Sequence, residues 1–212
     1  GSILNDIKRT SMWSPSVRRS PTIPSKITEK IRSVLYANNT YRRKFLNDIG
    51  KKIYNEWNPG KMDMWVRLTY LGSGRQVGRS CLLLHTPNSK ILLDCGINPA
   101  IAEGPEKFPY LNVSEIGDLN SIDAIILSHA HIDHSGLIPY LFKMGYRGPI
   151  YMTEPTRDIA VLLALDFVGV AYKQAASPLY RAEDIKEMVR HSICLDYGEV
   201  TDITPDIRIT FY

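Results

Sequence analysis

The sequence predicts an α/β fold from about residue 62 onward, because strand-like and helix-like segments alternate along this part of the chain. Apolar and polar residues alternate over 66–70, as in a half-buried strand, whereas 122–127 is an apolar run, interrupted by Asp123, of the kind typical of a strand buried on both faces. Helices are expected over 135–144 and 153–174, the second with Pro155 in its first turn. Further strands are expected at 81–85, 91–93, 149–152, 193–195 and 207–211, and a charged helix at 182–190.

The front of the chain differs from the body in its residue composition and in the elements it predicts. Residues 1–24 pass from a short amphipathic piece into a stretch rich in Pro, Ser and Arg, which is typical of a linker. Ser25 and Thr40 are candidate N-caps of two helices with apolar positions at 3.6-residue spacing. We therefore expect three parts: the linker at 1–24, a basic helical connector at 25–61 and the α/β body at 62–212.

Composition excludes several classes of protein. With 212 residues and 44% apolar content, the chain can bury a sizeable core. The longest apolar run, 159–172, contains Asp166 and is too short to span a membrane. No secretory signal is evident, and the three cysteines are too few and too scattered for a disulfide framework or a zinc ribbon. We expect a cytoplasmic protein with reduced thiols.

Charge is divided unevenly between the front and the body. Residues 1–61 carry 13 Lys and Arg against 4 Asp and Glu, and residues 62–212 carry 13 against 18. This division favours an anionic partner at the front, although a solvated basic helix face explains the charge equally well.

The strongest chemical signal is the segment 128–136, which places three histidines and an aspartate within six residues just after an expected buried strand. His129 and His131, two apart in extended backbone, can hold one metal ion, and the following turn brings Asp133 and His134 toward a second position. These four residues are the candidate metal ligands, and Asp133 and His134 are also the candidate catalytic residues. Imidazole and carboxylate donors suit zinc, with manganese or iron as competitors.

The pattern His-x-His-x-Asp-His-x-Gly after an apolar strand resembles the metal motif of the metallo-β-lactamase superfamily. Asp94, within Ile-Leu-Leu-Asp-Cys-Gly, matches the aspartate that ends an earlier strand of that fold and organises the metal ligands without binding the ion. The resemblance implies that residues 62–212 form the N-terminal half of an αββα sandwich, preceded by the basic helical region.

Other segments resemble the β-CASP branch of this superfamily, and especially archaeal homologues of the cleavage and polyadenylation specificity factor (CPSF). Gln76 departs from the branch, because a glutamate is common at that position. The front of the chain resembles the exit from the tandem KH domains of those homologues, so 1–24 would be the tail of a KH-like region. The segments that carry the resemblance are 72–81, 151–156 and 195–200 in the body and 1–7 and 13–15 at the front.

The resemblance implies a ribonuclease that holds two zinc ions. It would cut RNA internally and also trim it from 5′ to 3′, in RNA 3′-end processing and transcription termination. Its implied partners are RNA, the transcription machinery and a second copy in a homodimer, with no role for a membrane. The basic residues expected to contact RNA are Arg18, Arg19, Arg42, Arg43 and Lys44. Two alternatives stay open: a non-catalytic RNA-binding scaffold, and a hydrolase of small esters on the same fold.

One departure concerns the remaining metal ligands. After His134 the chain contains only His191, which does not match the next motif of the family, and we expect it to be structural, like His85. The family pattern would place the next ligand histidine, and the group that protonates the leaving oxygen, beyond Tyr212. We therefore expect a truncated chain, inactive as a fragment, with an empty or partly occupied metal site.

Overall fold

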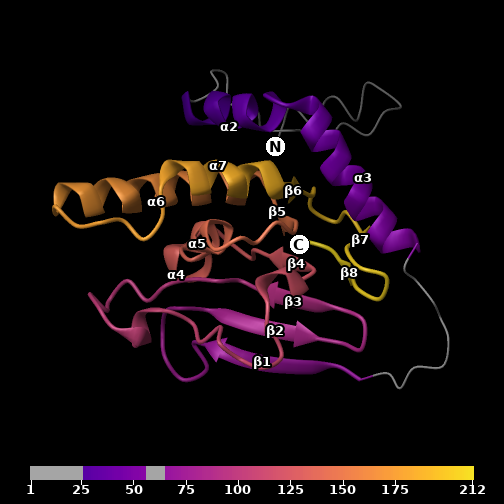
Figure 1. Ribbon diagram of the computed structural model, residues 1–212, viewed down its shortest axis with the longest axis horizontal. Coiled ribbons are helices and arrows are strands. Elements are labelled where there is room, and N and C mark those ends of the chain that lie inside the picture. The colour runs from indigo at the N-terminus through magenta and orange to yellow at the C-terminus, as the bar shows by residue number, and fades with distance from the viewer. Residues whose placement is uncertain (1–25, 56–64) are drawn as a thin grey trace, which may run out of the picture.

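The computed structural model describes residues 26–55 and 65–212, whose elements are shown in Figure 1. The predicted linker at 1–24, with Arg18 and Arg19, lies outside the described residues. The main sheet contains β1 (Arg67–Gly72), β2 (Cys81–His85), β3 (Lys90–Leu93), β4 (Ala124–Ile126), β5 (Ile150–Met152) and β6 (Ser192–Cys194). A small second sheet pairs β7 (Thr201–Asp202) with β8 (Arg208–Ile209). The helices are α2 (Lys26–Tyr36), α3 (Asn39–Asn55), α4 (Ile132–Ser135), α5 (Ile138–Lys143), α6 (Glu154–Lys173) and α7 (Ala182–His191), with 3-10 turns η1 (Pro105–Lys107) and η2 (Leu119–Ser121).

The main sheet is mixed, and its strands follow one another in chain order from β1 to β6. The first three strands are antiparallel, whereas β3, β4, β5 and β6 run parallel. Short turns are sufficient for the antiparallel pairs, whereas the parallel pairs need crossover connections. The crossover from β3 to β4 contains η1 and η2, the next contains α4 and α5, and the last contains α6 and α7. This arrangement confirms the predicted α/β class.

The sheet buries apolar side chains on both faces. On one face, Leu92 and Ile125 belong to the larger core, which also includes residues of α2, α5, α6 and α7. On the other face, Ile91 and Tyr151 form a smaller core with Ile203, next to the β7–β8 pair. The alternation from Ile91 to Leu92 follows the period of two along a strand, and burial on both faces explains the apolar run at 124–127.

The two front helices are packed against the body. Ile31 of α2 is buried in the larger core, and α2 contacts α6 and α7. In α3, Lys52 forms an ion pair with Asp123, its Nζ lying 2.5 Å from Oδ1. Figure 1 shows α2 above the orange helices and α3 descending toward β7 and β8. The expected connector is therefore partly integrated into the core.

The alternation at the start of the body predicts a half-buried strand, and the structure has a strand there, β1, but not the expected burial. Leu68 and Tyr70 are exposed on this edge strand, and burial begins only at Leu71.

A second difference from the sequence-based expectation follows the metal motif. One helix was expected over 135–144, but α4 begins at Ile132 and α5 follows as a separate helix. Pro139 lies in the first turn of α5, where its missing N–H costs no hydrogen bond, and it fits a new helix start better than a helix interior. Asp133 and His134 consequently lie within α4.

The parallel strands bring the ends of distant segments to one edge of the sheet. Leu93 at the end of β3 is paired with Ile126 at the end of β4, and the backbone N–H of Asp94 donates to the carbonyl of Ile126 at 2.9 Å. The residue after β3 and the motif after β4 therefore meet at the carboxyl edge, where α/β folds commonly place functional groups.

None of the helices in the described ranges combines the length and the apolar character needed to cross a membrane.

His191, expected to be structural, is buried at the end of α7 with a relative exposure of 1%. Its Nδ1 donates to the carbonyl of Glu187 at 2.9 Å, and its Nε2 accepts from the hydroxyl of Tyr41 on α3 at 3.1 Å. Burial lowers the pKa of His191 below its ordinary value of 6.5, and Arg147 and Arg42 act in the same direction, against the raising effect of Glu187. The folded state therefore favours neutral His191.

This pKa shift predicts loss of stability in mild acid. Below about pH 6.5 the unfolded chain takes up a proton at His191 that the folded chain does not bind, so the free energy of unfolding falls as pH decreases toward the lowered pKa. Thermal unfolding measured between pH 7.5 and 5.5 should show a melting temperature that falls as the pH is lowered. In His191→Gln the fall in melting temperature should be smaller. An equal slope in the variant would contradict this assignment.

Candidate metal centre

The four predicted ligands lie on one short segment that follows β4. His129 and His131 are in the extended stretch, and His131 is the N-cap residue of α4. Asp133 and His134 lie within that four-residue helix. The helix start turns the ring of His134 toward that of His129.

The three imidazole rings are close neighbours. The ring centroid of His129 lies 4.9 Å from that of His131 and 3.9 Å from that of His134. Nε2 of His134 is 3.6 Å from Oδ2 of Asp133. Burial, followed by the nearby charge of His134, lowers the pKa of His129 and favours its neutral form, which is the form that binds metal.

Asp94 lies beneath these rings and is largely buried, with a relative exposure of 7%. Its Oδ1 accepts from the backbone N–H of Ser128 at 2.7 Å, and its Oδ2 accepts from the hydroxyl of Ser128 and from Nδ1 of His134, each at 2.8 Å. Its φ of 59° is in the left-handed region, which aspartate adopts more readily than most residues. Asp94 thus holds the first residue of the motif and a predicted ligand at once.

The motif backbone is clamped by two loops. The N–H of Ser80, just before β2, donates to the carbonyl of Asp133 at 2.8 Å, and the N–H of Cys95, after β3, donates to the carbonyl of His134 at 2.8 Å. The N–H of Gly96 in turn donates to the carbonyl of Ser80 at 2.9 Å. The three segments therefore fix one another, and the side chains of Asp133 and His134 remain available for binding.

Gly96 is required at this clamp for steric reasons. A Cβ at this position would lie 1.8 Å from the carbonyl oxygen of Asp133 and 2.4 Å from the backbone nitrogen of His134. No side chain fits at such distances without displacement of the motif backbone.

Ser80, Gly96 and Ser128 are site residues that the sequence did not indicate. Gly96 lies two residues after Asp94, within the segment Ile-Leu-Leu-Asp-Cys-Gly that matched the family, and this proximity was the available signal. Ser80 and Ser128 lie in segments that the sequence singled out, 72–81 and 128–136. Their contacts depend on which loops meet in three dimensions, so the sequence did not indicate their roles.

The donor chemistry fits a metal ion, since imidazole nitrogens and a carboxylate oxygen gather on one loop with an aspartate hydrogen-bonded behind them. Across residues 26–55 and 65–212, however, no three His, Cys, Asp or Glu side chains are arranged so that they would hold one ion. Which of the predicted ligands bind metal therefore remains a prediction.

The cysteines in the described residues are free, with Cys81 and Cys95 buried and Cys194 partly buried. A hydrogen bond to Cys95, together with burial, raises the pKa of the Cys81 thiol. The Cys81 thiol is therefore a protonated packing group.

The candidate RNA contacts on α3 have different surroundings. The guanidinium of Arg42 is half-buried and donates to the carbonyls of Arg190 at 2.5 Å and Ser192 at 2.7 Å. This burial lowers the pKa of Arg42. Arg43 and Lys44 are exposed on the same helix. Arg42 therefore anchors α3 to the end of α7, whereas Arg43 and Lys44 face solvent.

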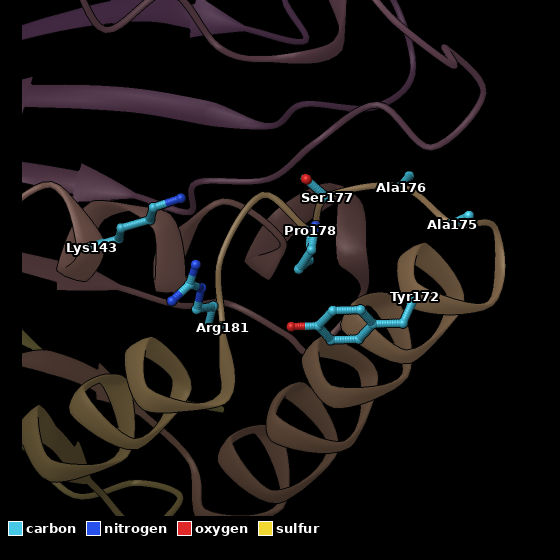
Figure 2. A pocket seen from close by; sticks show the side chains of 7 residues that line it. All are labelled: Lys143, Tyr172, Ala175, Ala176, Ser177, Pro178 and Arg181. Carbon is cyan, nitrogen blue, oxygen red and sulfur yellow. The ribbon is translucent and has the colours of Figure 1, made fainter.

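A second polar feature is a surface hollow of about 560 Å³ at the end of α6. Figure 2 shows Lys143, Tyr172 and Arg181 around it, with Ser177 in the connecting loop. None of the residues that line the hollow belongs to the motif at 128–136 or to the segment around Asp94. The hollow is therefore separate from the candidate metal centre.

The segment that contains the candidate metal centre matches a known protein family. Residues 74–145, which include Asp94 and all four predicted ligands, match the model of the metallo-beta-lactamase superfamily. This segment belongs to that superfamily, as the motif predicted.

The whole chain is also homologous to archaeal proteins named transcription termination factor FttA. It is 47% identical over 212 residues to the one from Methanothermobacter thermautotrophicus and 46% identical over 212 residues to the one from Methanosarcina mazei. Each alignment covers 100% of this chain and 33% of the relative, so the chain spans about a third of the length of these relatives. This homology supports the predicted resemblance to archaeal CPSF homologues.

Among solved structures, the subclass B3 metallo-beta-lactamase MEM-A1 has a TM-score of 0.40 at 21% identity over 65% of this chain and 46% of its own.

The steric role of Gly96 generates a prediction. In Gly96→Ala the added methyl group collides with the motif backbone, and we expect destabilisation of roughly 1–3 kcal/mol together with weaker zinc binding. Thermal unfolding and zinc titration would measure both effects. Gly169→Ala in α6 is the matched control, because nothing beyond its chain neighbours and its own helix backbone lies within 4 Å of the added Cβ, and alanine favours a helix. Equal behaviour of the two variants would contradict the clamp.

Proposed function

We propose that this chain supplies part of the catalytic centre of a metal-dependent ribonuclease of the β-CASP type, which acts in transcription termination and RNA 3′-end processing in the cytoplasm. The observation that carries the proposal is the set His129, His131, Asp133 and His134 at the carboxyl edge of the sheet, with Asp94 hydrogen-bonded behind it. Homology to archaeal termination factors over the whole chain supports the biological context.

Each residue of the centre has a proposed task. His129 and His131 would hold one zinc ion, and Asp133 and His134 a second. The two ions, when bound, would activate water and neutralise charge on the phosphoryl oxygens. Asp94 orients His134 through its Nδ1, which leaves Nε2 of that ring directed toward Asp133. The clamp from Ser80 and Cys95 fixes the backbone of the same pair.

The proposed organisation places RNA recognition at the front. The division into 1–24, 25–61 and 62–212 remains our proposal, with a KH-like tail and linker first, the basic connector second and the first half of the metallo-β-lactamase domain third. RNA, the transcription machinery and a second copy of the protein are the proposed partners.

The first test is Asp133→Ala in the full-length protein. Loss of a carboxylate ligand should reduce RNA cleavage by more than the roughly 10–100-fold that is typical of losing a group behind the ligands. RNA binding should be preserved, because Asp133 is not in the basic region. Cleavage of labelled RNA and binding by fluorescence anisotropy would be measured together. A scaffold protein would show no cleavage in either form, and this outcome would refute the proposal.

A second test concerns the exposed cations of α3. Each phosphate contact contributes roughly 0.7–0.9 to the slope of log affinity against log salt concentration, so Arg43→Ala combined with Lys44→Ala should reduce that slope by about 1–2. The matched control combines Lys173→Ala with Lys186→Ala, an equal loss of charge at exposed positions of α6 and α7. An unchanged slope in the Arg43 and Lys44 variant would exclude these residues from the RNA contact.

A further inference from the structure

Ser128 connects the buried carboxylate to a second histidine. Its hydroxyl donates to Oδ2 of Asp94 at 2.8 Å and lies 3.0 Å from Nδ1 of His129. A serine hydroxyl has one proton, and an ionised carboxylate only accepts hydrogen bonds. Since that proton is directed to Asp94, the Ser128 oxygen is the acceptor and Nδ1 of His129 is the donor.

His134 has the same relation to Asp94 without an intermediary. Its Nδ1 lies 2.8 Å from Oδ2 of Asp94, the same oxygen that Ser128 contacts. One carboxylate oxygen therefore directs the protons of two imidazole rings, directly for His134 and through the Ser128 hydroxyl for His129.

We propose that Ser128 is a positioning residue. Its hydroxyl bridges Asp94 and His129 by hydrogen bonds and so holds the His129 ring as the tautomer with its proton on Nδ1. A neutral imidazole has a single N–H, so this tautomer leaves the lone pair of Nε2 free to bind metal. The proposal deepens the proposed metal centre and rests on it for its purpose, although the hydrogen bonds themselves need no metal.

The hydrogen bonds from Asp94 and Ser128 explain how the neighbouring rings of His129 and His134 can both be held as the tautomer that binds metal through Nε2. The centroids of His129 and His134 lie 3.9 Å apart, and Asp94 and Ser128 act on the Nδ1 side of both. Without the hydroxyl, the proton of His129 can move to Nε2 and block its lone pair. Groups behind metal ligands typically contribute about 10–100-fold to metal affinity, and we expect a loss of this order in Ser128→Ala.

The test is nitrogen NMR of metal-free full-length protein with ¹⁵N-labelled histidine rings, which reports the tautomer of each histidine. The wild type should show His129 protonated on Nδ1. Ser128→Ala should convert His129 to a mixture of tautomers, and Ser128→Thr, which keeps the hydroxyl, should restore the wild-type state. Zinc affinity, measured by competition with a chelator, should fall in Ser128→Ala and recover in Ser128→Thr.

Ser135→Ala provides the matched control. Its hydroxyl is in the same motif but donates to the backbone carbonyls of Ala130 and His131, so its loss should leave the His129 tautomer unchanged. An Nε2-protonated His129 in the wild type would overturn the proposal even if Ser128→Ala failed to fold. An unchanged tautomer in a folded Ser128→Ala would also overturn it. Absence of RNA cleavage by the wild type would instead refute the proposed function and leave these NMR results intact.

Discussion

The candidate centre depends on one buried carboxylate. Asp94 follows β3 in a left-handed backbone conformation and accepts three hydrogen bonds, two from Ser128 and one from His134. A buried carboxylate is tolerated when such donors replace its hydration, so the fold must bring the end of β4 and the start of α4 to this point. The parallel register of Leu93 with Ile126 provides this, because it sets the residues after the two strands side by side.

The same constraint explains why the motif is held mainly through its backbone. Ser80 and Cys95 donate to the carbonyls of Asp133 and His134, and the absence of a side chain at Gly96 lets the loop after β3 approach them. Backbone hydrogen bonds position α4 without using the ligand side chains. A site built in this way can keep its donor groups free for an ion while its scaffold is fixed, which is the preorganisation that metal catalysis requires.

Much of this could be predicted from the sequence because the signals were local. The apolar run of β4 and the proline in the first turn of α6 each belong to one segment, and the spacing of the motif histidines is a property of nine consecutive residues. The alternation in β1 predicted a strand correctly but its half-burial wrongly, because Leu68 and Tyr70 are exposed. The break between α4 and α5 was missed, although Pro139 marks it. Ser80 and Ser128 could not be found in this way, because their roles follow from loops that meet only in the folded chain.

The basic front shows a similar limit of sequence reasoning. The sequence alone does not distinguish Arg42 from Arg43, since both lie in one positively charged run. In the folded chain, however, the guanidinium of Arg42 donates to the carbonyls of Arg190 and Ser192 in place of water. Lys52 likewise pairs with Asp123. Net charge therefore overstates the cations that a nucleic acid could contact, since a cation that satisfies buried carbonyls or a carboxylate cannot also bind phosphate without breaking those bonds. The front acts as an electrostatic surface only through those charges that folding leaves exposed, and on α3 these include Arg43 and Lys44.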